Sequence, residues 1–155
     1  MLDKEKEKLI KATISRTRHS DFDVIIKNTQ FPKLPWNNLR ENYNEVYKLT
    51  INKEITGLIQ FFFEKQIIKT IEITKLEVLK ENIGNRKKYD YLAGCLIAYA
   101  CFYSLKKHNG DVYILCNDNF KRHYINKYGM IPYDKDYVKS LKHNSEELVK
   151  KYLMM

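Results

Sequence analysis

The stretch NRKKYDYLAGCLIAYA, Asn85–Ala100, decides the fold because it joins a basic loop directly to the most apolar helix of the chain. Three cations, Arg86, Lys87 and Lys88, come first, followed by Tyr-Asp-Tyr and then apolar sequence. From Leu92 to Leu105 the apolar residues recur about every 3.6 positions, which predicts a helix with a wide apolar face. A polar stop, Lys-Lys-His-Asn-Gly, follows this helix.

Strand-forming sequence precedes the helix. Three runs rich in β-branched and aromatic residues are separated by short polar turns, which predicts an antiparallel meander. The runs are Glu45–Asn52, Ile55–Glu64 and Ile67–Leu79, with turns at 52–54 and 65–66.

A strand and two helices are expected after the apolar helix. The continuous apolar run Asp111–Cys116 predicts a short strand buried on both faces. Asn117–Met130 predicts a helix that is capped by an Asn or Asp and closed at Gly129. The tail Leu141–Met155 predicts a short C-terminal helix with Glu146 and Glu147 in its first turn.

The first 44 residues carry weaker patterns. Leu2–Ile14 predicts a weakly amphipathic helix, Asp23–Asn28 a short strand, and Phe31–Tyr43, with two of the three prolines, an irregular segment. Trp36 stands out there as the one tryptophan of the chain. Without a repeat or a linker, the 155 residues are expected to form one domain, 1–155.

The composition limits the classes of protein to which the chain can belong. The net charge of +9 comes mostly from lysine, which favours anionic partners or simply a solvated surface. The N-terminus has no apolar core, so no signal peptide is expected, and no apolar run is long enough to span a bilayer. Cys95, Cys101 and Cys116 have no CxxC spacing, which favours buried, reduced thiols in a cytoplasmic protein. The four histidines are scattered, so no metal site is expected.

The order meander, basic loop, apolar helix, buried strand and helix ending in Tyr-Gly resembles the GNAT (Gcn5-related N-acetyltransferase) fold. The resemblance covers roughly residues 45–133. It implies an α/β (α+β) fold with a central mixed, mostly antiparallel sheet flanked by helices. Residues 1–44 would then be an acceptor-side segment, and residues 134–155 a C-terminal strand and helix.

The resemblance implies a cofactor loop before the apolar helix. The family pattern Gln/Arg-x-x-Gly-x-Gly/Ala, which wraps the pyrophosphate of acetyl-CoA, aligns with Lys88–Ala93. Ala93 agrees with its last position, whereas Lys88 replaces Gln/Arg and Tyr91 replaces the central Gly. Unpaired amides at a helix N-terminus suit a phosphate for physical reasons alone. The implied cofactor-binding residues are Arg86, Lys87, Lys88, Tyr91, Leu92, Ala93, Gly94 and Cys95. The alternative interpretation is a core helix capped by Asp90, with the three cations solvated.

A second family feature follows the buried strand. There the family has an Asn that contacts the pantetheine arm and a Tyr that protonates the departing thiolate. Asn117 matches the Asn, and Tyr124 matches the Tyr if the helix carries one extra residue; without it, Ile125 falls on that position. A phenol beside a thiolate can donate its proton. Tyr124 is equally well explained as an aromatic residue packed on the sheet.

The family often places a glutamate base on the strand before the cofactor loop. Glu77 and Glu72 are the candidates, and Glu77 is favoured because it lies near the end where that strand is expected to splay. Glu72 is expected deeper in the strand and facing solvent. The backbone of Leu76 and Val78 would pair with the pantetheine amides and polarise the thioester carbonyl.

The resemblance therefore implies an acyl-CoA-dependent N-acyltransferase that uses acetyl-CoA as co-substrate and acts by direct transfer in a ternary complex. The acceptor is an amine: a small amine, a protein terminus, or a nucleic-acid-linked amine such as one on tRNA. A monomer or a homodimer is expected. Two alternatives stay open: a catalytically degenerate GNAT-like domain that binds CoA or a macromolecule, and a small basic RNA-binding protein.

Overall fold

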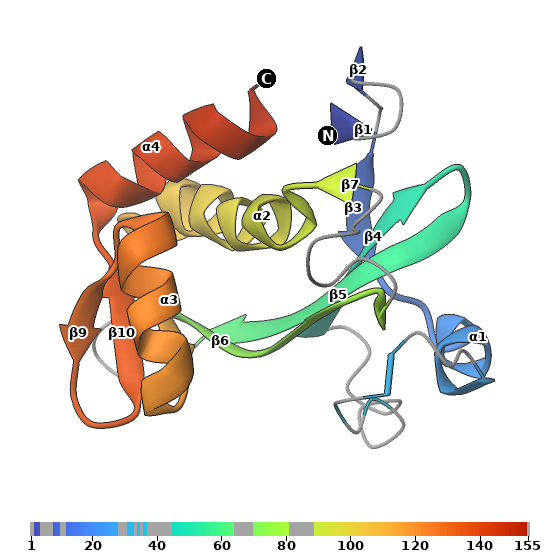
Figure 1. Cartoon of the computed structure of the whole chain (residues 1–155), viewed down its shortest axis with the longest axis horizontal. Helices are drawn as coiled ribbons and strands as arrows, with labels where there is room; N and C mark the ends of the chain where they lie inside the picture. Colours follow the sequence, from blue (N-terminus) through green and yellow to red (C-terminus); the bar gives the residue numbers. More distant parts are fainter. Residues whose placement is uncertain are drawn as a thin grey trace. The chain divides into compact units, whose positions relative to one another are not determined.

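The computed structural model describes residues 2–3, 8–9, 12–27, 31–32, 34, 36, 45–63, 70–80 and 89–154. Figure 1 shows its elements. They are β1 Leu2–Asp3, β2 Lys8–Leu9, β3 Thr13–Arg16, α1 Asp21–Lys27, β4 Val46–Ile51, β5 Glu54–Phe63, β6 Ile71–Val78, β7 Tyr89–Asp90, α2 Leu92–Lys107, β8 Val112–Leu115, α3 Asp118–Tyr128, β9 Ile131–Tyr133, β10 Tyr137–Ser140 and α4 Lys142–Leu153.

Two sheets organise these strands. The larger has the order β3-β4-β5-β6-β8-β10-β9, and the smaller has the order β2-β1-β7. Among the pairings whose register is described, β6 and β8 run parallel and the others run antiparallel. The mixed, mostly antiparallel sheet predicted from the sequence is therefore confirmed.

The chain divides into two compact units, residues 1–60 with 75–96 and residues 61–74 with 97–155. Whether the whole chain acts as one domain with its core at 45–133 stays a prediction.

In the first unit, β4 and β5 form the predicted hairpin around a turn at Asn52 and Lys53, both in the left-handed region. An apolar cluster forms beside it, which we call the Trp36 cluster. Its buried members are Phe22, Ile25, Phe31, Trp36, Val46, Ile55, Leu58 and Leu79.

Gly57 lets the first turns of α2 lie close to β5. A Cβ at this position would lie 2.8 Å from Cδ1 of Leu96, which real Cβ atoms essentially never do. The helix can therefore pack closely here because the strand has no side chain at this point.

Two predictions for the N-terminal part are wrong. The structure has strands within Leu2–Ile14 instead of a helix, and β3 pairs with β4 with Ile14 opposite Leu49. Pairing with an existing strand outweighs a weak helical pattern. The strand predicted over Asp23–Asn28 is not present in its described part, because α1 covers Asp21–Lys27.

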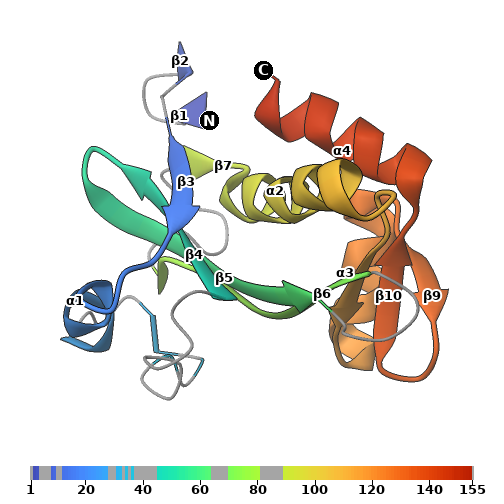
Figure 2. The same cartoon turned by 180° about the vertical axis from the view of Figure 1, so that it is seen from behind.

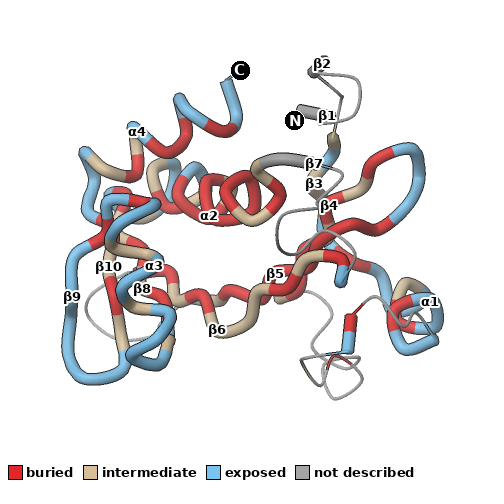
Figure 3. Tube along the Cα trace, in the orientation of Figure 1, coloured by how far each residue is buried: buried red, intermediate tan, exposed pale blue. Residues whose placement is uncertain are grey.

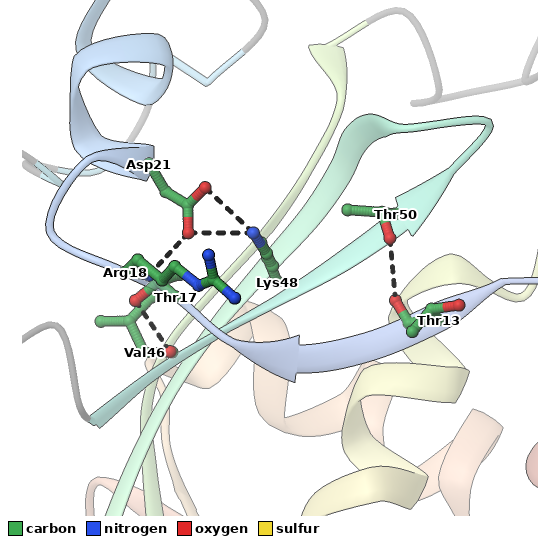
Figure 4. Close-up of polar contacts among 7 residues, drawn as sticks. All are labelled: Thr13, Thr17, Arg18, Asp21, Val46, Lys48 and Thr50. Atoms are coloured by element: carbon green, nitrogen blue, oxygen red, sulfur yellow. Dashed lines mark hydrogen bonds and ion pairs between the residues drawn. The ribbon is translucent and has the colours of Figure 1, made fainter.

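Polar contacts hold this part of the first unit together (Figure 4). Nζ of Lys48 lies 2.9 Å from both carboxylate oxygens of Asp21, and the backbone N–H of Arg18 donates to the same carboxylate over 2.6 Å. The hydroxyl of Thr17 donates to the carbonyl of Val46 over 3.0 Å. These contacts tie the start of α1 to β4.

In the second unit, α2 continues to Lys107, β8 pairs with β10, and α3 and α4 follow (Figure 2). The helix predicted over Asn117–Met130 is confirmed with its caps: Asn117 is the N-cap, and Gly129 ends the helix in the left-handed region at φ 67°. β9 is exposed along its length, whereas Val138 and Ser140 of β10 are buried (Figure 3).

Two details of the second unit differ from the sequence prediction. β8 is not buried on both faces: Val112 and Ile114 are buried, but Leu115 is 45% exposed. The C-terminal helix begins at Lys142, so Glu146 and Glu147 lie beyond its first turn. The hydroxyl of Ser145 donates to the carbonyl of Gly110 over 2.6 Å, which fixes α4 by a buried contact.

Candidate active site

The end of β6 is where this strand loses its parallel partner. Pairing with β8 joins Ile71–Ile73 to Val112–Ile114, and β6 continues for five more residues to Val78. Across these two strands, both described throughout, no pair beyond Ile73 with Ile114 is present. The continuation carries the predicted Leu76, Glu77 and Val78, and in other proteins an extended ligand can pair with the edge of a strand.

Glu77 is buried at this end of β6. It is 5% exposed, and among the described residues it is the only Asp, Glu, Lys or Arg that is buried. Nε1 of Trp36 donates a hydrogen bond to its Oε1 over 2.8 Å. A buried carboxylate needs such a partner, because an unpaired charge in the interior is costly.

Glu72 lies at the other end of the same strand and differs from the prediction. Instead of facing solvent it is half-buried, and it accepts a hydrogen bond from the hydroxyl of Tyr137 over 2.5 Å. This contact gives Glu72 a structural partner within the second unit.

Two linked side-chain hydrogen bonds connect neighbouring strands in the first unit. Nε2 of Gln60 donates to Oε2 of Glu45, and Nζ of Lys75 donates to Oε1 of Gln60, both over 3.2 Å. Lys75 precedes Glu77 by two residues in β6, so both side chains are expected on the same face of the strand.

The start of α2 has an unusual backbone. Tyr91 has φ 72°, in the left-handed region that glycine adopts most readily, and its carbonyl accepts the backbone N–H of Cys95 over 2.8 Å. Tyr91, which the resemblance aligns with the central glycine of the family pattern, therefore has a backbone conformation that glycine favours. The amides of Leu92, Ala93 and Gly94 are in the first turn, where a helix offers them no acceptor.

Cys95 lies in the same turn. Burial raises the pKa of its thiol to about 11. It is therefore a neutral thiol at physiological pH, with no nucleophilic character to suggest a catalytic cysteine.

Arg86, Lys87 and Lys88 lie outside the described residues, as does the predicted turn at 65–66. The side chain of Asp90 is likewise not among those described, so its capping role stays a prediction. Of the predicted cofactor loop, the structure describes the backbone from Tyr89 onward and the side chains from Tyr91 onward.

Asn117 and Tyr124 belong to the second unit. Oδ1 of Asn117 accepts the backbone N–H of Phe120 over 3.1 Å, so this side chain caps α3. Tyr124 is half-buried beside the rings of His123 and Tyr128. Burial, with a smaller electrostatic contribution from Cys116, raises the pKa of its hydroxyl to about 12.

The structure brings part of the predicted site together. Leu76–Val78 and Tyr91–Cys95 belong to one unit, and both the carbonyl of Glu77 and the side chain of Leu96 approach Gly57. The sequence singled out Trp36 without a role, and its contact with Glu77 was missed. No local pattern could have found a pair that is 41 residues apart.

Comparison with solved structures identifies the fold. A GNAT-family acetyltransferase from Listeria monocytogenes superposes with a TM-score of 0.66 at 12% identity, covering 85% of this chain and 95% of that one. The chain has the GNAT fold.

Two further GNAT-fold structures were solved with the cofactor or an analogue. AtaTR bound with acetyl-CoA has a TM-score of 0.64 at 14% identity, over 88% of this chain and 97% of that one. Naa50 of Arabidopsis thaliana, in complex with the bisubstrate analogue CoA-Ac-MVNAL, has a TM-score of 0.62 at 16% identity, over 83% and 97%. No protein-family model and no curated protein sequence matches the chain.

Among the described residues, no group of three or more His, Cys, Asp or Glu side chains could hold a metal ion. The described helices include none with the length and apolar character needed to cross a membrane.

Proposed function

We propose that this chain is an acetyl-CoA-dependent N-acyltransferase that transfers the acyl group directly to an amine in a ternary complex. The observation that carries the proposal is the end of β6, which continues for five residues beyond its pairing with β8 and holds the one buried carboxylate among the described residues. The GNAT fold and the bound ligands of the structures with that fold support it.

The cofactor would be held by backbone groups. The amides at the start of α2, with the partial positive charge of a helix N-terminus, would bind the pyrophosphate, aided by Arg86, Lys87 and Lys88. The backbone of Leu76 and Val78 would pair with the pantetheine amides. An N–H at this edge would polarise the thioester carbonyl.

The chemical step needs one base and one acid. Glu77, directly or through a water, would take the proton from the attacking amine. The amine nitrogen bonds to the carbonyl carbon, the carbon–sulfur bond breaks, and the electron pair leaves on sulfur as the thiolate of coenzyme A. Tyr124 would protonate that thiolate, and its raised pKa of about 12 keeps the hydroxyl protonated at neutral pH.

Calorimetry with acetyl-CoA and with CoA tests the proposal. Binding with a Kd in the micromolar range is expected, together with release of CoA thiol when an amine acceptor is added. Absence of heat at millimolar acetyl-CoA would remove the function and leave only the fold.

A second candidate is a catalytically degenerate GNAT-like domain, and the bulky side chain of Tyr91 in the cofactor loop favours it. The substitution Tyr91→Gly separates the two. Glycine fits φ 72° without strain, so we expect the variant to be more stable by about 1 kcal/mol. Tighter CoA binding by this variant would indicate a pocket obstructed by tyrosine, and weaker binding would indicate that the tyrosine contacts the ligand.

A matched control for this experiment is Ala93→Gly in the first turn of α2. Its backbone is helical, so glycine there costs about 1 kcal/mol relative to alanine. Urea unfolding of the two variants should therefore move in opposite directions, which separates the effect of the left-handed backbone from a general effect of glycine.

A further inference from the structure

The buried carboxylate at the end of β6 has a dedicated hydrogen-bond donor from a distant part of the chain. Nε1 of Trp36 and Oε1 of Glu77 are 2.8 Å apart, and the two side chains are 2% and 5% exposed. An N–H···O distance of this length is that of a well-formed hydrogen bond. The indole N–H can only donate, so it stabilises negative charge on Oε1.

The donor itself is held firmly. The backbone N–H of Trp36 donates to the carbonyl of Leu34 over 2.9 Å. The indole belongs to the Trp36 cluster, where Phe22 and Ile25 of α1 and Leu79, just after β6, are also buried. The direction of the N–H is thus fixed by apolar packing on several sides.

A carboxylate with one oxygen fixed can no longer rotate freely about its last torsion. Its second oxygen then keeps a defined direction, as a base that removes a proton along a fixed line requires. We infer that Trp36 is a positioning residue, which orients the carboxylate of Glu77 for proton removal from the acceptor amine. This inference rests on the proposed function.

The contact can be tested without any activity. Trp36 is the only tryptophan beside 12 tyrosines, so emission excited at the red edge of the absorption band, where tyrosine does not absorb, reports on this one indole. Glu77→Gln replaces the charged acceptor by a neutral amide and is expected to change the emission. Glu72→Gln, on the same strand but bonded to Tyr137, is the matched control and should leave the emission unchanged. Equal emission of both variants and the parent would overturn the contact.

The positioning role is tested by a double-mutant cycle on acetyl-CoA turnover, with glycinamide as the acceptor. Trp36→Phe keeps an aromatic ring but removes the donor, and we expect it to lower kcat roughly tenfold while the KM for acetyl-CoA stays unchanged. In the Glu77→Gln background the same change should have little further effect, because the group it orients is gone.

The control for packing is Phe31→Leu, which removes an aromatic ring from the Trp36 cluster and keeps the indole N–H. Its loss of kcat should be small, and equal in the parent and in the Glu77→Gln background. If Trp36→Phe lowers kcat by the same factor in both backgrounds, its role is structural and the inference fails. Calorimetry of the same variants with acetyl-CoA keeps that outcome separate from the proposed function, which fails if the parent chain binds no acetyl-CoA or releases no CoA thiol.

Discussion

At the scale of single residues, the candidate site depends on protonation states that burial sets. A thiol or a phenol removed from water resists losing its proton, because the anion that would form is poorly solvated. A tyrosine hydroxyl is already protonated at neutral pH with its ordinary pKa of 10.0, and the raised pKa of Tyr124, about 12, extends this protonated range to more alkaline pH. The family role of an acid suits this state, whereas the role of a base does not.

Replacement of Tyr124 by phenylalanine removes that donor and leaves the ring. We expect kcat to fall about a hundredfold, since a positioned general acid typically contributes at least that factor. The pH–rate profile below about pH 11 should keep its shape, because a hydroxyl with a pKa of about 12 does not titrate there. Tyr133→Phe, at a 42% exposed residue of β9, is the control and should leave the rate unchanged. A fully active Tyr124→Phe enzyme would show that Tyr124 only packs.

Residues whose role is local could be predicted from the sequence. A cap by an Asn or Asp and an end at Gly129 were expected for the helix over Asn117–Met130, and both are present, because capping depends on neighbours within one turn. Glu77 was preferred over Glu72 from its place near the strand end, but its burial and its indole partner could not be predicted. They depend on packing between segments far apart in the sequence.

At the scale of elements, local sequence patterns predicted the wrong secondary structure where contacts with other segments decide the outcome. Val24, Ile25 and Ile26 are β-branched and indicated a strand, yet Phe22 and Ile25 are buried one helical turn apart while Val24 is 57% exposed. Asp21 in the first turn favours the helix through its dipole and fixes it to Lys48. The strongly patterned β4, β5, β6 and α2 were predicted correctly because core burial dictates their period.

The packing of α2 on β5 yields a prediction at this scale. In Gly57→Ala the new methyl group would lie 2.8 Å from Cδ1 of Leu96, so the end of the buried Leu96 side chain must shift. We expect a loss of about 1 to 3 kcal/mol in the free energy of unfolding, measured by urea denaturation, although alanine alone suits a strand better than glycine.

The double variant Gly57→Ala with Leu96→Ala provides the control. Leu96 is fully buried, and its truncation alone should cost about 2 to 5 kcal/mol. If the new methyl group clashes with the Leu96 side chain, the free energy of unfolding lost in the double variant is smaller than the sum of the losses in the two single variants. Strict additivity would mean that the clash with Leu96 is not the cause.

At the scale of the whole molecule, burial gives stability a dependence on alkaline pH. Cys101 is fully buried, and desolvation raises the pKa of its thiol from 9.0 to about 11, although hydrogen bonds with Ser145 and Ser140 act in the opposite direction. Burial also raises the pKa of the Tyr124 hydroxyl. In each case the folded protein holds its proton more tightly than the unfolded chain does.

This difference fixes the sign of the pH effect. Above about pH 9 the unfolded chain releases the Cys101 proton while the folded protein retains it, so the free energy of unfolding falls as pH rises toward about 11. A rise of the pKa from 9.0 to about 11 corresponds to a loss of free energy of unfolding on the order of 2 to 3 kcal/mol.

Urea unfolding with reductant at pH 8 and near pH 11 should show this loss in the parent chain. Cys101→Ala should show a smaller loss, because alanine has no proton to release. The control is Cys116→Ala at a half-buried residue, which should change the pH dependence of stability much less. An equal loss in the parent and in Cys101→Ala would mean that other groups carry the alkaline sensitivity.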